Sequence, residues 1–411
     1  MKVLLVNKFH YRKGGSETYY FTLAQALARR GHEVIFFAMQ DEKNLPCPQE
    51  GYFVSNASVG GSLRSKMNMV MHIAYSKEAY GKMKQLLAQE KPDLVIMNLV
   101  HKQITLSILD AIGELDAKVP VFWTMHDLIA ACPAYTMLNG RGEVCEKCMG
   151  GQFGHCVKNK CIKGSRLMSM LSYYEARYIQ KKQWYDRVDL YICPSEFYAN
   201  KLRQAGFTRQ EIVAMRNPLP ADIAYGGGTA GDYVLYFGRL SREKGVKTLI
   251  DAAKAVGCKL EILGTGPMED AWKAYAKDAP DVHFRGFQTG EALQAYIRNC
   301  RCVVLPSEWY ENGPYSAMEA MALGKPIIVS DMGGLPELVC DGANGYVYAG
   351  GSEALAECIR KMFLLDGDAY EQMSHCAQET AKSLFDADQY VTFLEKKYRE
   401  LAGESIWQQK N

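Results

Sequence analysis

Residues 306–326 read PSEWYENGPYSAMEAMALGKP, and this stretch decides the fold of the chain. It predicts a short helix over about 314–323, because proline is tolerated at the first helical position and Gly324 is a typical helix stop. Apolar runs at 303–305 and 327–329 predict a strand before the helix and another after it. Strand, loop, helix and strand together form a βαβ crossover, so we expect a parallel sheet.

In such a crossover the helix begins at the carboxyl end of a strand, where its free backbone N–H groups attract anions. Glu311 precedes the helix, and Glu319 lies about one and a half turns into it. Carboxylates repel phosphate but accept hydrogen bonds from sugar hydroxyls. The pattern therefore indicates a sugar-nucleotide site in which the helix start holds a diphosphate, Glu319 the ribose hydroxyls, and Glu311 the sugar. Two solvated surface glutamates are the alternative interpretation.

Length and composition agree with a two-domain enzyme. A chain of 411 residues suggests two domains of about 200 residues each. With 48 Lys and Arg against 46 Asp and Glu, no overall field exists that would attract nucleic acid. The chain opens on an apolar strand rather than a signal peptide, and no run approaches the roughly 18 apolar residues of a membrane span. We therefore expect a cytoplasmic protein with reduced thiols, soluble or peripheral at the inner face of the membrane.

Predicted strands alternate with helices in both halves, which is typical of doubly wound parallel sheets. We expect the following division of the chain: an N-terminal domain over 1–192, a linker region over 193–230, a second domain over 231–384, and a final helical segment over 385–411.

A second loop carries three permanent cations, Arg239, Arg242 and Lys244. The run 238–245, GRLSREKG, follows a predicted strand and places Arg239 and Lys244 five residues apart. Arginine can fork onto phosphate oxygens and lysine supplies a point charge, so both suit the negative charge that develops on a departing diphosphate. A solvated basic loop is the alternative.

Two features of the first half lie where predicted strands end. Gly14-Gly15 separates the first strand from the first helix, which lets the backbone approach a ligand and leaves helix N–H groups free. His126 ends the strand 121–124, at the edge where ligands bind in open sheets. A simple turn and a structural histidine are the respective alternatives.

The segment 132–161 is rich in cysteine. Cys145 and Cys148 form a C-x2-C pair, and Cys132 and Cys161 lie symmetrically outside it. Four thiolates would complete a tetrahedral zinc shell, so we predict one structural zinc held by these four residues, with Cys156 as the alternative fourth ligand. Free buried thiols are the other interpretation. A redox pair fits less well, because the C-x2-C opens no helix.

Basic and apolar residues alternate directly beyond this segment. The basic residues are Lys158, Lys160, Lys163, Arg166, Arg177, Lys181, Lys182 and Arg187, and the apolar ones are Leu167, Met168, Met170, Leu171, Tyr173 and Tyr174. An amphipathic helix over the core is one interpretation. Contact with anionic lipid, which would bring the chain to a lipid-linked acceptor, is the other.

The stretch 306–326 closely resembles the nucleotide-sugar motif of the family 4 glycosyltransferases, and the resemblance includes SDMGGLPELV at 330–339. It covers nearly the whole chain and is strongest over 238–347. It implies an α/β GT-B fold, with two doubly wound, Rossmann-like domains facing a central cleft. The first domain would bind the acceptor and the second the donor, and the chain end would pack back on the first. The resemblance is to a subgroup with a cysteine-rich loop in the N-terminal domain.

The resemblance also implies the activity: retaining transfer of a sugar, without a catalytic metal, from a nucleotide-activated donor to a glycan or lipid-linked acceptor in surface polysaccharide assembly. A UDP-sugar is the favoured donor and a GDP-sugar the alternative. No Asp-x-Asp string lies near the proposed diphosphate site, in agreement with a metal-independent reaction.

Residue roles carried over from the family are as follows: catalysis by His126, Arg239, Lys244 and Glu311; donor binding by Gly15, Arg239, Lys244, Gly313, Pro314, Tyr315, Ser316 and Glu319. His126 would orient a hydroxyl of the transferred sugar. Where family members often carry a histidine-rich string, this chain has PDLVIMNLVH at 92–101, so Asn98 and His101 are the candidates for acceptor contacts.

Two other functions remain open at this point. One is a sugar-nucleotide epimerase or glycosyl phosphorylase of similar architecture. The other is a non-catalytic protein that binds a sugar nucleotide. The joint presence of Arg239, Lys244, Glu311 and Glu319 favours the transferase.

Overall fold

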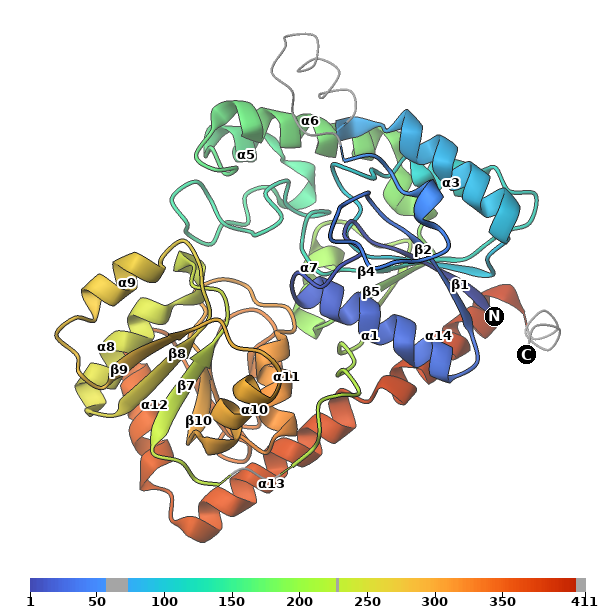
Figure 1. The fold of residues 1–411 in the computed structure, drawn as a ribbon. Helices are drawn as coiled ribbons and strands as arrows, with labels where there is room; N and C mark the ends of the chain where they lie inside the picture. Colours follow the sequence, from blue (N-terminus) through green and yellow to red (C-terminus); the bar gives the residue numbers. More distant parts are fainter. Residues whose placement is uncertain (57–72, 227–228, 404–411) are drawn as a thin grey trace. The chain divides into compact units, whose positions relative to one another are not determined.

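The computed structural model describes residues 1–56, 73–226 and 229–403, which form two compact units (Figure 1). Unit 1 comprises Met1–Pro220 and Ala387–Asn411, and unit 2 comprises Ala221–Asp386. Each unit is built on its own parallel sheet.

Unit 1 holds a six-stranded parallel sheet in the order β2-β1-β3-β4-β5-β6. The strands are β1 (Lys2–Val6), β2 (Glu33–Phe37), β3 (Leu94–Met97), β4 (Val121–Thr124), β5 (Leu190–Cys193) and β6 (Glu211–Ala214). The inner strands β3, β4 and β5 are buried along their whole length, which is why they read as continuous apolar runs. The chain runs from β1 out to β2 and returns to β3 on the other side of β1. The strand order therefore reverses between β1 and β3, where open α/β sheets bind ligands.

The helices of unit 1 are α1 (Gly15–Arg29), α3 (Lys77–Glu90), α4 (Ile108–Gly113), α5 (Gly154–Lys158), α6 (Arg166–Lys182), α7 (Glu196–Gln204) and α14 (Ala387–Ala402), with 3-10 turns at Glu50–Tyr52, Met149–Gly151 and Trp184–Arg187. The expected linker region 193–230 is in part wrong, because its residues up to Pro220 supply α7 and the edge strand β6. Ser195 caps α7 by accepting a hydrogen bond from the backbone N–H of Tyr198 at 3.2 Å.

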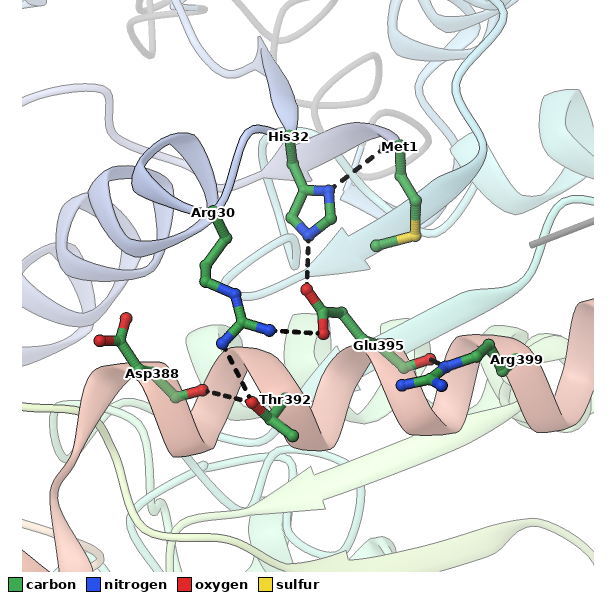
Figure 2. Close-up of polar contacts among 7 residues, drawn as sticks. All are labelled: Met1, Arg30, His32, Asp388, Thr392, Glu395 and Arg399. Atoms are coloured by element: carbon green, nitrogen blue, oxygen red, sulfur yellow. Dashed lines mark hydrogen bonds and ion pairs between the residues drawn. The ribbon is translucent and has the colours of Figure 1, made fainter. Parts of the chain in front are cut away.

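The helix α14 belongs to unit 1 although it is remote in sequence from the rest of that unit. Polar contacts attach it to residues near the N-terminus (Figure 2). Oε1 of Glu395 lies 3.0 Å from Nε2 of His32, and Oε2 lies 2.8 Å from the Arg30 guanidinium. Burial lowers the pKa of His32, so the neutral ring donates from Nε2 and accepts at Nδ1 from the amino group of Met1, 3.3 Å away. Further along α14, the hydroxyl of Tyr390 lies 2.8 Å from that of Tyr19.

Unit 2 holds a second six-stranded parallel sheet, in the order β12-β11-β10-β7-β8-β9. The strands are β7 (Tyr233–Phe237), β8 (Lys259–Leu263), β9 (Val282–Gly286), β10 (Cys302–Leu305), β11 (Ile327–Ser330) and β12 (Gly345–Tyr348). The chain runs outward from β7 to β9, and β10 then returns to pair with β7. The strand order of unit 2 therefore reverses between β7 and β10.

The helices of unit 2 are α8 (Val246–Val256), α9 (Glu269–Tyr275), α10 (Gly290–Asn299), α11 (Tyr315–Ala322), α12 (Ser352–Leu364) and α13 (Gly367–Leu384), with 3-10 turns at Arg242–Lys244 and Pro336–Leu338. Leu249 and Ile250 of α8 and Leu355 and Ile359 of α12 are fully buried in one apolar cluster with the sheet. Within the described ranges, no helix has the length and apolar character needed to cross a membrane.

Candidate functional site

Two loops meet at the point where the strand order of unit 2 reverses. The loop 238–245 follows β7 and the loop 306–314 follows β10, and their backbones are in contact. At Gly245, where φ is +67°, an added Cβ would lie 1.8 Å from the carbonyl oxygen of Pro306, so only glycine fits. The backbone N–H of Glu308 also donates to the carbonyl of Glu243 at 2.8 Å. The cationic loop and the glutamate loop predicted from the sequence are therefore held side by side.

Lys244 and Glu311 form an ion pair between these loops, with Nζ 2.5 Å from Oε1. The same oxygen accepts hydrogen bonds from Oγ of Ser307 at 2.6 Å and Nε1 of Trp309 at 2.9 Å. Burial raises the pKa of Glu311, but attraction to Lys244 and these hydrogen bonds outweigh it and lower the pKa overall. Glu311 is thus a buried carboxylate held in one orientation.

The segment after β11 supports the Glu311 loop from behind. The backbone N–H of Gly334 donates to the carbonyl of Glu311 at 2.7 Å, and Oγ of Ser330 donates to the carbonyl of Ser307 at 2.6 Å. Gly333 has a φ of +66°, and an added Cβ would lie 2.3 Å from the carbonyl oxygen of Glu311. Gly333 of the sequence SDMGG is therefore needed for the close approach of these two segments.

The helix α11 begins directly after the Glu311 loop, within one residue of the predicted start. Pro314 is its N-cap, in extended conformation, and Tyr315 is the first helical residue. Ser316 and Glu319 lie on its less buried side, one turn apart. Burial raises the pKa of Glu319 to about 7. Within the described residues its carboxyl group makes no side-chain hydrogen bond, in contrast to that of Glu311.

Arg239 differs from Lys244 in its surroundings. Its side chain is exposed, and no ion pair of the described residues includes it, whereas its carbonyl accepts a hydrogen bond from the hydroxyl of Tyr236 at 2.9 Å. Lys244 is therefore held against a carboxylate, whereas Arg239 is open to a ligand. Both lie at the edge of the sheet from which α11 starts.

In unit 1, His126 lies where β3 and β4 end. Its Nε2 is 3.1 Å from Oδ1 of Asn98, and its ring packs edge-on against Tyr19 with the centroids 4.8 Å apart. Nδ2 of Asn98 in turn donates to the carbonyl of Val6 at 3.2 Å. Burial lowers the pKa of His126 to about 3, so the ring is neutral near pH 7 and can orient a hydroxyl but not supply a proton as imidazolium.

The other predicted residues of unit 1 take two different positions. Gly15 is the first residue of α1, and the buried Glu17 in the same turn accepts hydrogen bonds from Asn7 at 3.3 Å and Ser16 at 3.0 Å. His101 stacks on Trp123 with centroids 5.4 Å apart, within an aromatic group that includes Tyr185. Asn98 thus contacts His126, whereas His101 contacts the aromatic side chains.

Sequence reasoning missed three ionisable groups of unit 1 with shifted pKa values, of which Glu175 is buried and Lys8 and Asp127 are partly buried. Burial raises the pKa of Asp127 to about 6 and that of Glu175 to about 7, and it lowers the pKa of Lys8 to about 8. Asp127 was recognisable, because it follows His126 at a strand end. Glu175 gave no signal, since it lies mid-helix in a sequence that is otherwise basic and apolar.

Four of the five cysteines of the segment 132–161 form two thiol pairs, Cys132 with Cys148 and Cys156 with Cys161, each through a side-chain hydrogen bond. Cys145 has a different neighbour, Nδ2 of Asn159 at 3.9 Å. Within the described ranges, no group of three or more His, Cys, Asp or Glu side chains could hold a metal ion. The zinc site stays a prediction: Cys132, Cys148 and Cys161 lie near Cys156, the alternative fourth ligand, whereas Cys145 stands apart beside Asn159.

Both units are doubly wound α/β structures, and each carries candidate ligand residues where its strand order reverses. Two such units define a GT-B architecture. Residues 13–222, just over half of the chain, match the model of glycosyltransferase family 4, and residues 228–380 match that of the glycosyl transferases group 1. The chain therefore belongs to glycosyltransferase family 4.

Individual relatives agree with this family. The chain is 27% identical over 228 residues to the putative colanic acid biosynthesis glycosyltransferase WcaL of Salmonella typhimurium, covering 51% of this chain and 55% of WcaL. It is 29% identical over 143 residues to the amylovoran biosynthesis glycosyltransferase AmsK of Erwinia amylovora, covering 31% and 35%. The chain thus spans about half or less of the length of these curated relatives.

Solved structures with the same fold cover nearly the whole chain. Sucrose-phosphate synthase from Thermosynechococcus elongatus aligns with a TM-score of 0.69 and 19% identity, over 97% of this chain and 98% of that one. HepE from Anabaena, solved in complex with UDP-glucose, aligns with a TM-score of 0.63 and 18% identity, over 97% and 100%. At this identity the likeness establishes the fold alone.

Proposed function

We propose that the protein transfers a sugar from a nucleotide-activated donor to a glycan or lipid-linked acceptor in surface polysaccharide assembly, with retention of configuration and without a catalytic metal. The single observation that carries the proposal is the set of two cations and two carboxylates gathered where the strand order of unit 2 reverses, beside the start of α11. The names of WcaL and AmsK support the polysaccharide assignment.

The charges of the site suit a nucleoside diphosphate leaving group. The open guanidinium of Arg239 binds the diphosphate oxygens as a fork, and the backbone N–H groups of Gly313, Tyr315 and Ser316 at the start of α11 add donors without a counter-charge. Lys244 supplies a second cation, which Glu311 holds in place. Together they stabilise the charge that develops as the glycosidic bond breaks.

The carboxylates of Glu311 and Glu319 bind different parts of the donor. All three hydrogen bonds to Glu311 end on Oε1, and within the described residues Oε2 accepts none, so Oε2 is the oxygen that receives a sugar hydroxyl. Glu319 has no such partner and receives the ribose hydroxyls. The binding of a uridine nucleotide is favoured by analogy with HepE, which was solved with UDP and with UDP-glucose.

The side chains in unit 1 orient rather than react. A neutral His126, fixed by Asn98, offers one ring nitrogen to a hydroxyl of the transferred sugar. Gly15 at the start of α1 gives the donor a close backbone approach. No described residue is assigned the role of a nucleophile.

Release of nucleoside diphosphate from a panel of nucleotide sugars, with and without glycan acceptors, tests this proposal. Transfer requires stoichiometric UDP or GDP release together with a glycosylated product. An epimerase would return a changed nucleotide sugar without diphosphate release, and a binding protein would show thermal stabilisation by the nucleotide without turnover. Full activity in the presence of a chelator is expected, and an absolute requirement for added magnesium or manganese would overturn the metal-independent mechanism.

A further inference from the structure

The helix α6 carries large apolar side chains on the face turned to solvent. Leu167 is 67% exposed, Met170 49%, Tyr174 43% and Met168 39%. Leu167, Met170 and Tyr174 stand at i, i+3 and i+7, so they form one stripe along the helix. A surface helix of a soluble protein normally turns its apolar stripe toward the core.

The face of α6 that packs onto unit 1 is the more polar one. Its buried residues are Ser169, Ser172, Glu175 and Ile179. Ser169 is satisfied locally, since its Oγ donates to the carbonyl of Ser165 at 2.8 Å and accepts the N–H of Ile162 at 3.0 Å. The exposed apolar stripe therefore contributes little to the packing of α6, and its apolar character needs another explanation.

Basic side chains surround this stripe, and no exposed carboxylate accompanies them. Between residues 154 and 182 the sequence has seven Lys or Arg and a single acidic residue, Glu175, which is buried. All seven cations are exposed: Lys158, Lys160, Lys163 and Arg166 before the stripe, and Arg177, Lys181 and Lys182 at its far end. This local surface is strongly positive although the whole chain is nearly neutral.

A pocket of about 390 Å³ opens beside the stripe, between α5 and α6, which lie side by side in unit 1 (Figure 1). Its lining includes Lys158, His155, Tyr173 and Arg177. Two exposed cations thus converge on a hollow of a size that admits a small polar group such as a phosphate headgroup.

We propose that α6 and the basic turn before it dock on an anionic lipid bilayer. A bilayer accepts both features at once: the stripe of Leu167, Met170 and Tyr174 enters the boundary between headgroups and acyl chains, and the surrounding cations meet lipid phosphates. Lys158 and Arg177 hold one headgroup in the pocket. The charge complementarity favours an anionic lipid over a protein partner, because every exposed charge of this segment has the same sign.

Flotation with vesicles tests the proposal on the full chain, without any assumption about its activity. Vesicles of phosphatidylcholine that contain phosphatidylglycerol should carry the protein at low salt, and vesicles of phosphatidylcholine alone should not. Exposed charges are screened over about 10 Å at 0.1 M salt, so binding should fall steeply as salt rises. Each cation near an anionic surface contributes about fivefold to binding.

Two sets of variants test the basic side chains and the apolar stripe separately. Lys158→Gln, Arg177→Gln and Lys181→Gln together should weaken binding about a hundredfold. Leu167→Gln with Met170→Gln, which keeps every charge, should weaken it about tenfold or more. The matched control removes three exposed cations elsewhere, with Arg29→Gln, Lys277→Gln and Lys361→Gln, and should leave binding nearly unchanged. All positions are exposed, so the thermal unfolding of each variant should match that of the parent.

Binding to neither vesicle overturns the lipid assignment and leaves this face to a protein partner. Equal loss in the control variant also overturns it, because net charge rather than this surface would then decide binding. Salt-independent binding that survives the loss of Leu167 and Met170 would be a third contradiction.

Discussion

Nζ of Lys244 lies 2.5 Å from Oε1 of Glu311, across 67 positions of sequence. The Glu311 side chain is 7% exposed and that of Lys244 is 22% exposed, so the pair is only partly screened by water. Removing one partner of such a pair leaves an uncompensated charge, which costs far more than the pair itself contributes. Lys244 therefore has a structural partner, whereas Arg239 forms no ion pair with any residue that the structure describes.

This difference predicts different consequences for the two cations. Arg239→Ala should lower turnover about a hundredfold with little change in stability, because the arginine is exposed. Lys244→Ala should lower turnover similarly and also destabilise unit 2 by at least about 2 kcal/mol, because it strands the Glu311 carboxylate. Steady-state kinetics and thermal unfolding, with Arg242→Ala as the control in the same loop, distinguish these outcomes. Near-normal turnover of Arg239→Ala with saturating donor would remove its role at the diphosphate.

Gly333→Ala should displace the loop that holds Glu311. The added methyl group would lie 2.3 Å from the carbonyl oxygen of Glu311, and the residue would also keep a φ of +66°. Gly342 has a φ of +77° but open space around the added methyl, so Gly342→Ala carries only the backbone cost. We expect Gly333→Ala to be the less stable variant by about 2 kcal/mol and to lose donor turnover, measured by denaturant unfolding and kinetics. Equal stability of the two variants would contradict the close approach of these segments.

Glu319 should make unit 2 less stable as the pH rises through 7. Burial raises its folded-state pKa to about 7, above the ordinary value near 4.5, so the folded protein binds the proton more tightly than the unfolded one. The resulting stability is fully present below about pH 4.5 and is lost as the pH rises through 7. Glu319→Gln should therefore be more stable than the parent at pH 8, by about 2 kcal/mol, and no more stable at pH 5.

Thermal unfolding of both proteins across this pH range, without nucleotide, is the measurement. A constant difference between them would mean that Glu319 keeps an ordinary pKa. Calorimetry with UDP gives the second test, in which Glu319→Gln should bind the free nucleotide more weakly than the parent does, whereas Glu311→Gln should mainly impair turnover.

Cys161 should be an unusually reactive thiol. The hydrogen bond from Cys156 lowers the pKa of Cys161 to about 7, so the rate of its alkylation should rise with a midpoint near pH 7. Cys156→Ala removes the donor and should move this midpoint upward. Mass spectrometry of the alkylated peptides, with the exposed Cys340 as an internal reference, follows each thiol separately. A midpoint of about 9 in the parent would exclude the pairing.

The same labelling tests the sequence-based zinc prediction. Bound zinc would protect Cys132, Cys148, Cys156 and Cys161 together, and Cys145 would label whether or not zinc is added. Metal analysis of the protein purified without chelator complements it. Protection of Cys145 in place of Cys156 would restore the ligand set expected from the sequence spacing.

The local elements of unit 2 were predictable because their signals are local. The proline and glycine around 314–324 set the start of α11 to within one residue, and the apolar runs before and after it are the strands β10 and β11. The position of both candidate loops at a sheet edge follows from the βαβ pattern alone. Most residues of the candidate site could thus be proposed from the residue types at the ends of predicted strands.

What the sequence could not predict depends on distant contacts. The partnership of Lys244 with Glu311 arises only because β7 and β10 are neighbours in the sheet. The position of Cys156 in a thiol pair, in place of Cys145, depends on how the turns around 150–160 fold. The assignment of α7 and β6 to unit 1 required the pairing of β6 with β5, since β6 is a short, half-exposed strand that resembles a linker.

Unit 1 is discontinuous, because α14 follows all of unit 2 in the chain. A ribosome therefore completes unit 2 before it makes Tyr390 and Glu395, the residues that meet Tyr19 and His32. During that interval Tyr19 and His32 lack these partners on α14 and keep only those within the N-terminal part of the chain, Thr124 and Met1. Unit 1 can therefore complete its contacts only after unit 2 has been made, so we expect a reversal of the usual N-to-C order of domain folding during synthesis. Ribosome-stalled chains should become protease-resistant in the second half first.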